Sequence, residues 1–200
     1  MKKIKGKDKG FTLVELIVVI VILAILAAIL VPQLLGYIDK AKQKQDILDA
    51  RNCMTATQAK LTEIYAKSSA VGLNEASLVG GNIYGDVSWL GTPEAKDILT
   101  TADVDPYMLI VGLGDYETYR ETDLHKAYTV YFVAYWPKKD KDPIFFDGTE
   151  WKSEYPWKKS GGNTFTINGE SIKLQFYFIK APQTNMSNNW NELKAYLGIK

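Results

Sequence analysis

Residues 10–32 read GFTLVELIVVIVILAILAAILVP, and this stretch decides how the rest of the chain is interpreted. Between Phe11 and Val31, a run of 21 residues, only Thr12 and Glu15 are polar. As a helix rising about 1.5 Å per residue, this run would extend over roughly 31 Å, which matches the hydrocarbon core of a bilayer. The stretch therefore predicts a membrane-spanning helix with a carboxylate near its beginning.

The residues before the apolar run are strongly basic. They include one aspartate and five lysines, namely Lys2, Lys3, Lys5, Lys7 and Lys9. The positive-inside rule places residues 1–10 in the cytoplasm and everything after about Pro32 on the other side of the membrane. Without these ten residues the chain has 19 basic and 22 acidic side chains, a net charge of −3. Bulk charge therefore gives no reason to expect nucleic-acid binding.

The possible interpretations of this segment differ in whether they explain Glu15. A secretory signal peptide should end at a small-residue cleavage site, and Leu26 to Val31 offers only a poor one. An ordinary signal anchor accounts for the lysines and the length but not for the carboxylate. An ionisable group inside a membrane helix costs on the order of 2.5–3.5 kcal/mol, so Glu15 should have a partner.

The motif Gly10-Phe11-Thr12-Leu13-Val14-Glu15, after a lysine-rich leader and before an apolar helix, resembles the N-terminal signal of type IV pilins and related pseudopilins. The resemblance implies that a prepilin peptidase cuts between Gly10 and Phe11 and N-methylates Phe11. In a filament, the Glu15 carboxylate of an incoming subunit would then meet the Phe11 ammonium of its neighbour. The alternative is that Glu15 is the interfacial end of an ordinary anchor.

A bend is expected in the helix at Pro32 and Gly36. Proline removes one helical N–H group, and glycine weakens the same turn. The resemblance further implies that the stretch from Ala24 to Pro32 unwinds in filaments. A static kink in a continuous helix is the alternative.

Beyond Pro32 the pattern becomes amphipathic and predicts that the helix continues to about Ser68. Apolar or small residues recur mostly at spacings of three and four, as in Ile38, Ala41, Ile47, Ala50, Met54, Thr57, Leu61 and Ile64. One side of this half should pack on a folded headpiece, with Cys53 a small, half-buried residue. The expected organisation is a leader (1–10), an apolar helix half (11–31), an amphipathic half (32–68) and a headpiece (69–200).

The headpiece sequence predicts an antiparallel sheet, and hence an α+β chain with the type IV pilin fold. Residues 72–123 are punctuated by glycines, including Gly112 and Gly114, and are expected to be irregular apart from a short helix capped by Thr92 that ends near Leu99. The clearest strand is Ala127 to Trp136. Asp147-Gly148 and Asn168-Gly169 predict hairpin turns, the second leading into a strand over Ile172 to Ile179. A short capped helix is expected from Ser187 to Leu197, with Trp190, Leu193 and Leu197 on one face.

Signals of catalysis or cofactor binding are weak throughout. A single cysteine excludes an intrachain disulfide, and one histidine, His125, cannot build a Cys/His zinc site and is expected at the surface or half-buried. There is no phosphate-binding loop, so an enzyme is not expected and no cofactor is assigned. Asp140, Asp142 and Asp147 lack the spacing of an EF-hand, which favours a solvated loop over a calcium site.

Two possible surface functions have simpler explanations. The aromatic residues of the strands would alternate between faces, so about half should be core rather than carbohydrate-binding residues. Trp157-Lys158-Lys159 could touch DNA, but two lysines beside one tryptophan are commonplace.

Together these features predict a structural subunit of a type IV pilus that polymerises through its N-terminal helices. Its expected partners are other copies of the chain, prepilin peptidase and the inner-membrane assembly platform, and its functions adhesion, twitching motility, aggregation or biofilm formation. Before assembly it would be a single-pass protein of the cytoplasmic membrane, and afterwards part of an extracellular pilus. The alternatives are a pseudopilin of a type II secretion or competence system, and a membrane-anchored adhesin that never polymerises. The sequence leaves open whether the subunit is major or minor.

Overall fold

The computed structural model describes residues 10–71, 93–154, 164–182, 188–189 and 191–192. It divides into two units, Met1–Lys44 and Gln45–Lys200, which are described separately below. The first unit contains the apolar beginning of helix α1. The second contains the rest of α1 and the headpiece.

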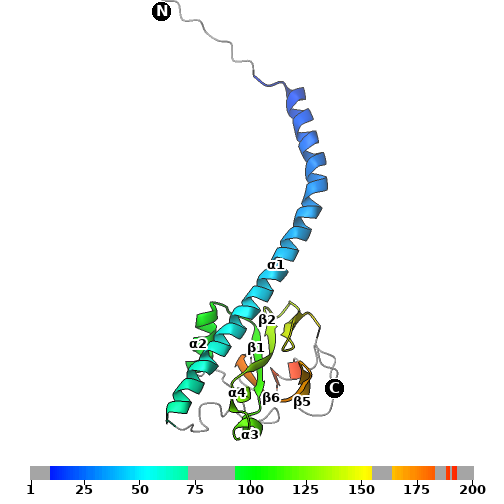
Figure 1. Cartoon of the computed structure of the whole chain (residues 1–200). Coiled ribbons are helices and arrows are strands. Elements are labelled where there is room, and N and C mark those ends of the chain that lie inside the picture. Colours follow the sequence, from blue (N-terminus) through cyan, green and yellow to red (C-terminus); the bar gives the residue numbers. More distant parts are fainter. Residues whose placement is uncertain (1–9, 72–92, 155–163, 183–187, 190, 193–200) are drawn as a thin grey trace, which may run out of the picture. The chain divides into compact units, whose positions relative to one another are not determined.

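Helix α1 runs from Leu13 to Val71 and is helical without interruption through Pro32 (Figure 1). The predicted end of the helix, at about Ser68, is therefore close to the observed one. In the second unit the buried face of α1 is formed by Ala50, Cys53, Ala56, Thr57 and Leu61. These residues recur at the helical spacings of three and four. Cys53 is completely buried, so the expectation of half-burial was wrong.

The described residues of the headpiece form a six-stranded sheet in the order β4-β3-β2-β1-β6-β5. All neighbouring strands pair antiparallel. The strands are β1 (Met108–Gly114), β2 (Val130–Trp136), β3 (Ile144–Phe146), β4 (Trp151–Lys152), β5 (Thr164–Ile167) and β6 (Glu170–Lys180). A long helix followed by an antiparallel sheet confirms the α+β class.

Strand β1 corrects the expectation that residues 72–123 are irregular. It pairs with β2 on one side and β6 on the other, and all seven of its residues are buried. A strand buried on both faces is a continuous apolar run without polar alternation, and MLIVGLG fits this pattern. Gly112 and Gly114, taken as loop residues in the sequence, lie inside the central part of the sheet.

The two faces of β1 belong to different apolar clusters. Leu109, Val111 and Leu113 pack in the cluster that contains Ala50, Cys53 and Leu61 of α1. Met108 and Ile110 belong to the second cluster, on the other face of the sheet, formed by Met108, Ile110, Phe132, Ala134, Trp136, Phe145, Ile167, Ile172, Leu174, Phe176 and Phe178. The alternation follows from the two-residue period of a strand. Stability without a disulfide therefore rests on apolar packing on both sides of β1.

Strand β2 begins at Val130, three residues later than expected. Ala127 is the last residue of a short helix, α4 (Leu124–Ala127), and Tyr128 is its C-cap. A second short helix, α3 (Tyr116–Tyr119), is capped by Asp115, whose carboxylate accepts from the Thr118 N–H. Among the described strand and hairpin aromatics, Tyr128, Phe132, Tyr135 and Trp136 are buried, which removes them as carbohydrate contacts.

Both predicted hairpin turns are confirmed. Asn168 and Gly169 have φ values of 53° and 81°, as a two-residue turn with left-handed backbone requires. Gly148 has a φ of 91°, in the turn between β3 and β4. Asn168 tolerates this conformation because its short polar side chain can bond locally.

The remaining predicted elements are only partly described. Helix α2 runs from Pro93 to Ala102, three residues past the predicted end, and Thr92, its expected cap, lies outside the described residues. Of the predicted tail helix, the described residues 188–189 and 191–192 are helical, while Trp190, Leu193 and Leu197 lie outside the description. So do Trp157, Lys158 and Lys159.

One side chain connects α1 to the start of β2 by two hydrogen bonds. The Gln58 amide nitrogen donates to the Tyr128 carbonyl oxygen at 2.9 Å, and the Gln58 amide oxygen accepts from the Val130 N–H at 2.9 Å. The Gln58 side chain thus pairs with the backbone as a neighbouring strand would. It satisfies two backbone groups at the point where α4 has ended and β2 begins.

A Gln58→Met substitution should lower the free energy of unfolding by about 2–4 kcal/mol, because both backbone groups would lose their partner. Gln45→Met is the matched control, because the Gln45 side chain bonds to Asp49 on an exposed face and to no other side chain that the structure describes. This substitution should change stability by no more than about 0.5 kcal/mol. Urea unfolding of the full chain in detergent micelles, followed by tryptophan fluorescence, measures both. Equal effects of the two substitutions would contradict the role given to Gln58.

Candidate processing and assembly site

The peptide bond between Gly10 and Phe11 lies just before helix α1, in a segment without regular structure. Phe11 is 85% exposed, and no atom lies within 4 Å of the position a Cβ at Gly10 would take. The described part of the leader therefore leaves this bond accessible.

Thr12 and Glu15 form a reciprocal cap at the start of α1. The Glu15 carboxylate accepts from the Thr12 N–H at 2.8 Å and from the Thr12 hydroxyl at 2.7 Å. In return, the Glu15 N–H donates to the Thr12 Oγ1 at 3.3 Å. This is a capping box, in which Ser or Thr at the N-cap and Glu or Gln three residues later satisfy each other's backbone N–H groups.

The capping box is a feature that the sequence analysis missed. Its signal was present, because Thr12-Leu13-Val14-Glu15 has the required spacing directly before an apolar run. The apolar surroundings of Glu15 in the sequence draw attention to its charge alone, which needs a partner. In this chain the Glu15 carboxylate already has a hydrogen-bonding partner, Thr12, at the N-terminal end of its own helix. The helix dipole also favours a negative charge at this end.

The apolar beginning of α1 presents its side chains on all sides. The large hydrophobic residues from Leu13 to Val31 are 46–73% exposed. Within the described residues, α1 is the one helix that is long and apolar enough, by length and composition, to cross a membrane. A surface of this kind is unstable in water and requires lipid or other protein around it.

Pro32 and Gly36, predicted to mark a bend, both lie within the continuous helix. No atom lies within 4 Å of the position a Cβ at Gly36 would take, so packing does not require glycine there. The stretch from Ala24 to Pro32 is helical as well. The bend and the unwinding in filaments remain predictions.

The aspartates considered for calcium lie on both sides of β3, with Asp140 and Asp142 before the strand and Asp147 directly after it. The Asp147 carboxylate accepts from the Thr149 and Glu150 N–H groups, both at 2.9 Å, and from the Lys152 ammonium at 2.6 Å. Its side chain is only 11% exposed. Burial alone would raise the pKa of Asp147, but the hydrogen bonds from Lys152 and the turn outweigh it and hold the pKa well below its usual range. The described residues contain no group of three or more His, Cys, Asp or Glu that could hold a metal ion.

Asp147→Asn should lower the free energy of unfolding by about 1.5 kcal/mol near neutral pH, because a charge-assisted bond to Lys152 is lost. A carboxylate whose pKa is lowered by folding stabilises the native state above its unfolded pKa, near 3.8, and this contribution fades as the pH falls toward the folded value. The difference between wild type and variant should therefore shrink below about pH 4. Urea unfolding at a series of pH values tests this, and a difference that stays constant into acid would contradict it.

The single cysteine and histidine offer no reactive site in the described structure. Burial raises the pKa of the Cys53 thiol to about 12, with the Asp49 carboxylate adding to the shift, so the thiol stays protonated. His125 is exposed, as predicted, and its Nδ1 contacts the Asp123 carboxylate.

Comparisons with known proteins agree with this arrangement. A family model described as the prokaryotic N-terminal methylation motif matches residues 5–31. The chain is 32% identical over 108 residues to the type IV wide pilus major component PilA4 of Thermus thermophilus, a match that covers 43% of this chain and 82% of that protein. It is also 32% identical over 113 residues to the narrow pilus major component PilA5 of the same organism, covering 53% of this chain and 90% of that one.

Another relative shares a higher sequence identity with this chain, over a shorter stretch. The chain is 53% identical over 49 residues to the type II secretion system core protein G of Vibrio cholerae, covering 24% of this chain and 33% of that protein. No solved structure gave a significant match. Since the methylation motif, the exposed apolar helix, the antiparallel headpiece and the pilin relatives all agree, this chain belongs to the family of type IV pilins and pilin-like pseudopilins.

Proposed function

We propose that this chain is a structural subunit of a type IV pilus, which polymerises through its N-terminal helices. One observation carries the proposal: a complete Gly-Phe-Thr-Leu-Val-Glu motif stands at the head of a helix whose apolar side chains are exposed on every side. Packing against the same segment of other copies is one way to cover such a helix outside the membrane. The match over most of the length of two major pilus components supports this assignment.

Processing would begin at the Gly10–Phe11 bond. The exposed, non-helical backbone at this bond suits attack by prepilin peptidase, with N-methylation of the new terminus at Phe11. Removal of residues 1–10 also removes the lysines that hold the leader at the cytoplasmic surface. Cleavage therefore both creates an ammonium group and releases an electrostatic anchor.

Glu15 would then act as a docking charge. Before docking, its carboxylate is held by the Thr12 N–H and hydroxyl groups, which reduces the cost of keeping it in the membrane. Hydrogen bonds from Thr12 leave the net charge of −1 uncompensated, and the Phe11 ammonium of a neighbouring subunit would neutralise it. The capping box would thus orient the Glu15 carboxylate at the N-terminal end of α1, where the Phe11 ammonium of the neighbouring subunit would bind.

In this account the subunit performs mechanical rather than catalytic work. Before assembly it spans the cytoplasmic membrane, with residues 1–10 inside and the headpiece outside. The inner-membrane assembly platform then adds it to an extracellular filament. The relatives are named as pilus components and a secretion core protein, which agrees with a structural role. Adhesion, twitching motility, aggregation and biofilm formation are the functions that such a filament would serve.

A second candidate is a pseudopilin of a type II secretion system. The observation that favours it is the identity of 53% over 49 residues to core protein G. That match covers a third of the relative, whereas the pilus components are matched over 82% and 90% of their lengths. For this reason the pilus is the preferred assignment.

Deletion of the coding region from the producing cell separates the two candidates. If the chain is a pilus subunit, the deletion strain should yield few or no filaments when its cell surface is sheared. Its set of secreted proteins should stay unchanged. Loss of secreted proteins with intact surface filaments would overturn the pilus assignment in favour of secretion. Complementation with the wild-type chain is the control for both measurements.

A further inference from the structure

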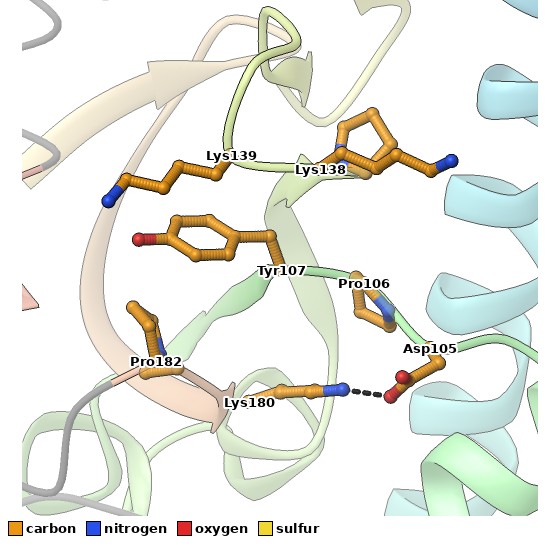
Figure 2. A pocket seen from close by; sticks show the side chains of 9 residues that line it. Asp105, Pro106, Tyr107, Lys138, Lys139, Lys180 and Pro182 are labelled. Atoms are coloured by element: carbon orange, nitrogen blue, oxygen red, sulfur yellow. Dashed lines mark hydrogen bonds and ion pairs between the residues drawn. The ribbon is translucent and has the colours of Figure 1, made fainter.

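The headpiece contains an open cavity of about 370 Å³ that the filament function does not use. It lies where the loop before β1, the loop after β2 and the end of β6 meet, and its lining is Asp105, Pro106, Tyr107, Pro137, Lys138, Lys139, Lys180, Ala181 and Pro182 (Figure 2). The volume falls within the range of small-molecule sites, about 300–1,000 Å³. We propose that this cavity binds an acidic saccharide, with Tyr107 as the stacking surface and Lys139 as the carboxylate contact.

The net positive charge of the cavity lining favours an anionic ligand. Three lysines stand against one aspartate, and Lys180 is paired with Asp105. Lys139 is exposed and makes no ion pair with any residue that the structure describes. In Figure 2 the side chains of Lys139 and Tyr107 extend in the same direction, whereas Lys138 points the other way. Lys139 is therefore the cation available to a ligand that lies against the Tyr107 ring.

Tyr107 provides a fixed ring with a fixed hydroxyl. Its ring packs edge-on against Trp136, with centroids 5.6 Å apart, and its hydroxyl donates to Glu192 Oε1 at 2.7 Å. Burial, together with the bond to Glu192, raises the pKa of Tyr107 to about 12, so the phenol stays protonated. With its proton committed to Glu192, the phenol oxygen can accept a hydrogen bond from a ligand hydroxyl.

The acceptors in the cavity suit a sugar. Asp105 uses Oδ1 for Lys180, and its side chain is 88% exposed, so Oδ2 faces solvent without a partner among the described residues. A sugar acid offers several hydroxyl donors, one carboxylate and an apolar ring face. Those groups correspond to the Asp105 and Tyr107 acceptors, the Lys139 ammonium and the Tyr107 ring.

An acidic peptide fits less well. Peptides bind most often by pairing their backbone with a strand edge or groove. Pro106, Pro137 and Pro182 remove three backbone donors from the cavity wall. The one N–H of Tyr107 is already bonded to the Trp136 carbonyl oxygen at 2.8 Å.

Calorimetric titration of the full chain in neutral detergent micelles tests the proposal, with galacturonic acid, galactose and a short poly-glutamate peptide as probes. Galacturonic acid should bind about tenfold more tightly than galactose, because a charge-assisted bond is lost with the neutral sugar. Lys139→Gln should weaken galacturonic acid binding by about tenfold. Lys96→Gln, at an exposed lysine on α2, should leave it unchanged.

Tyr107→Leu and Tyr107→Phe separate the ring from its hydroxyl. The leucine variant should lose binding of both sugars, while the phenylalanine variant keeps the ring and should retain part of it. Lys139 lies at the surface, so its substitution tests the site without endangering the fold. The proposal is overturned by any of three results: no binding of galacturonic acid, equal affinity for galactose, or equal or tighter binding of the peptide.

Discussion

A Glu15→Gln variant should insert into the membrane and be cleaved between Gly10 and Phe11, yet its filament yield should fall on the order of 100-fold. Removing one partner of a buried ion pair costs about 3 kcal/mol or more, because the Phe11 ammonium of the neighbouring subunit would then be buried without a counter-charge. Filaments sheared from cells and quantified against total chain measure the yield, and mass spectrometry of the membrane fraction reports cleavage.

Glutamine is the informative replacement because it also caps helices at this position. Its amide oxygen can accept from the Thr12 N–H as Glu15 does at 2.8 Å, so the variant loses the charge and retains the cap. Thr12→Val is the matched control: it removes the hydroxyl that bonds Glu15 and keeps the carboxylate. Thr12→Val should lower the yield less than about tenfold, since losing both hydrogen bonds of the Thr12 hydroxyl, and with them the N-cap, typically costs about 1 kcal/mol. An equal loss in both variants would assign Glu15 to helix capping alone, and a normal yield from Glu15→Gln would contradict the docking role.

A Gly114→Ala substitution should have the largest effect on stability, lowering the free energy of unfolding by about 3 kcal/mol or more. A Cβ at this position would lie 2.3 Å from the Lys126 carbonyl oxygen and 2.6 Å from its carbonyl carbon. These are backbone atoms of α4, so no side-chain rotation relieves the collision, and β1 would have to move away from α4. Urea unfolding of the full chain in micelles, followed by tryptophan fluorescence, measures the change.

Gly169→Ala is the control for the loss of a glycine as such. Gly169 has a φ of 81°, but nothing lies within 4 Å of its would-be Cβ. That variant should lose about 1–2 kcal/mol from backbone strain alone. If Gly114→Ala proves no more destabilising than Gly169→Ala, the close approach of β1 and α4 is not the constraint described above.

The collision at Gly114 also explains why the sequence analysis misplaced β1. Glycine between apolar residues reads as a break, yet at Gly112 a Cβ would come within 2.9 Å of the Phe132 Cβ on the neighbouring strand. The reason for glycine here is contact with β2 and α4, which are more than ten residues away in the chain. Such contacts leave no signal in the local sequence pattern, whereas a strand with alternating or β-branched residues can be predicted from its own sequence.

The start of β2 was misplaced for a similar reason. Ala127 and Tyr128 look like strand residues because the aromatic and β-branched pattern extends back to them. In the structure Ala127 ends α4, and Gln58 of α1 bonds to the Tyr128 carbonyl oxygen and the Val130 N–H. The boundary is set by a side chain from another element.

The long helix and both hairpin turns were predictable because their signals are local. Helical periodicity and left-handed turn residues act on neighbouring positions, so one sequence is sufficient to read them. The motif that contains Gly10, Phe11 and Glu15 is also local, since it lies within six residues, and its roles in processing and assembly remain predictions. The cavity around Tyr107 gathers residues from three distant segments, and only the fold could bring them together.

We infer that this chain is processed at Gly10 and assembled into a filament. Mass spectrometry of the main protein in filaments sheared from the producing cell tests it most directly. We expect this chain to be the bulk component, beginning at Phe11 and carrying one methyl group on its terminal nitrogen. Filaments that lack the chain, or that contain it with residues 1–10 still attached, would overturn this inference.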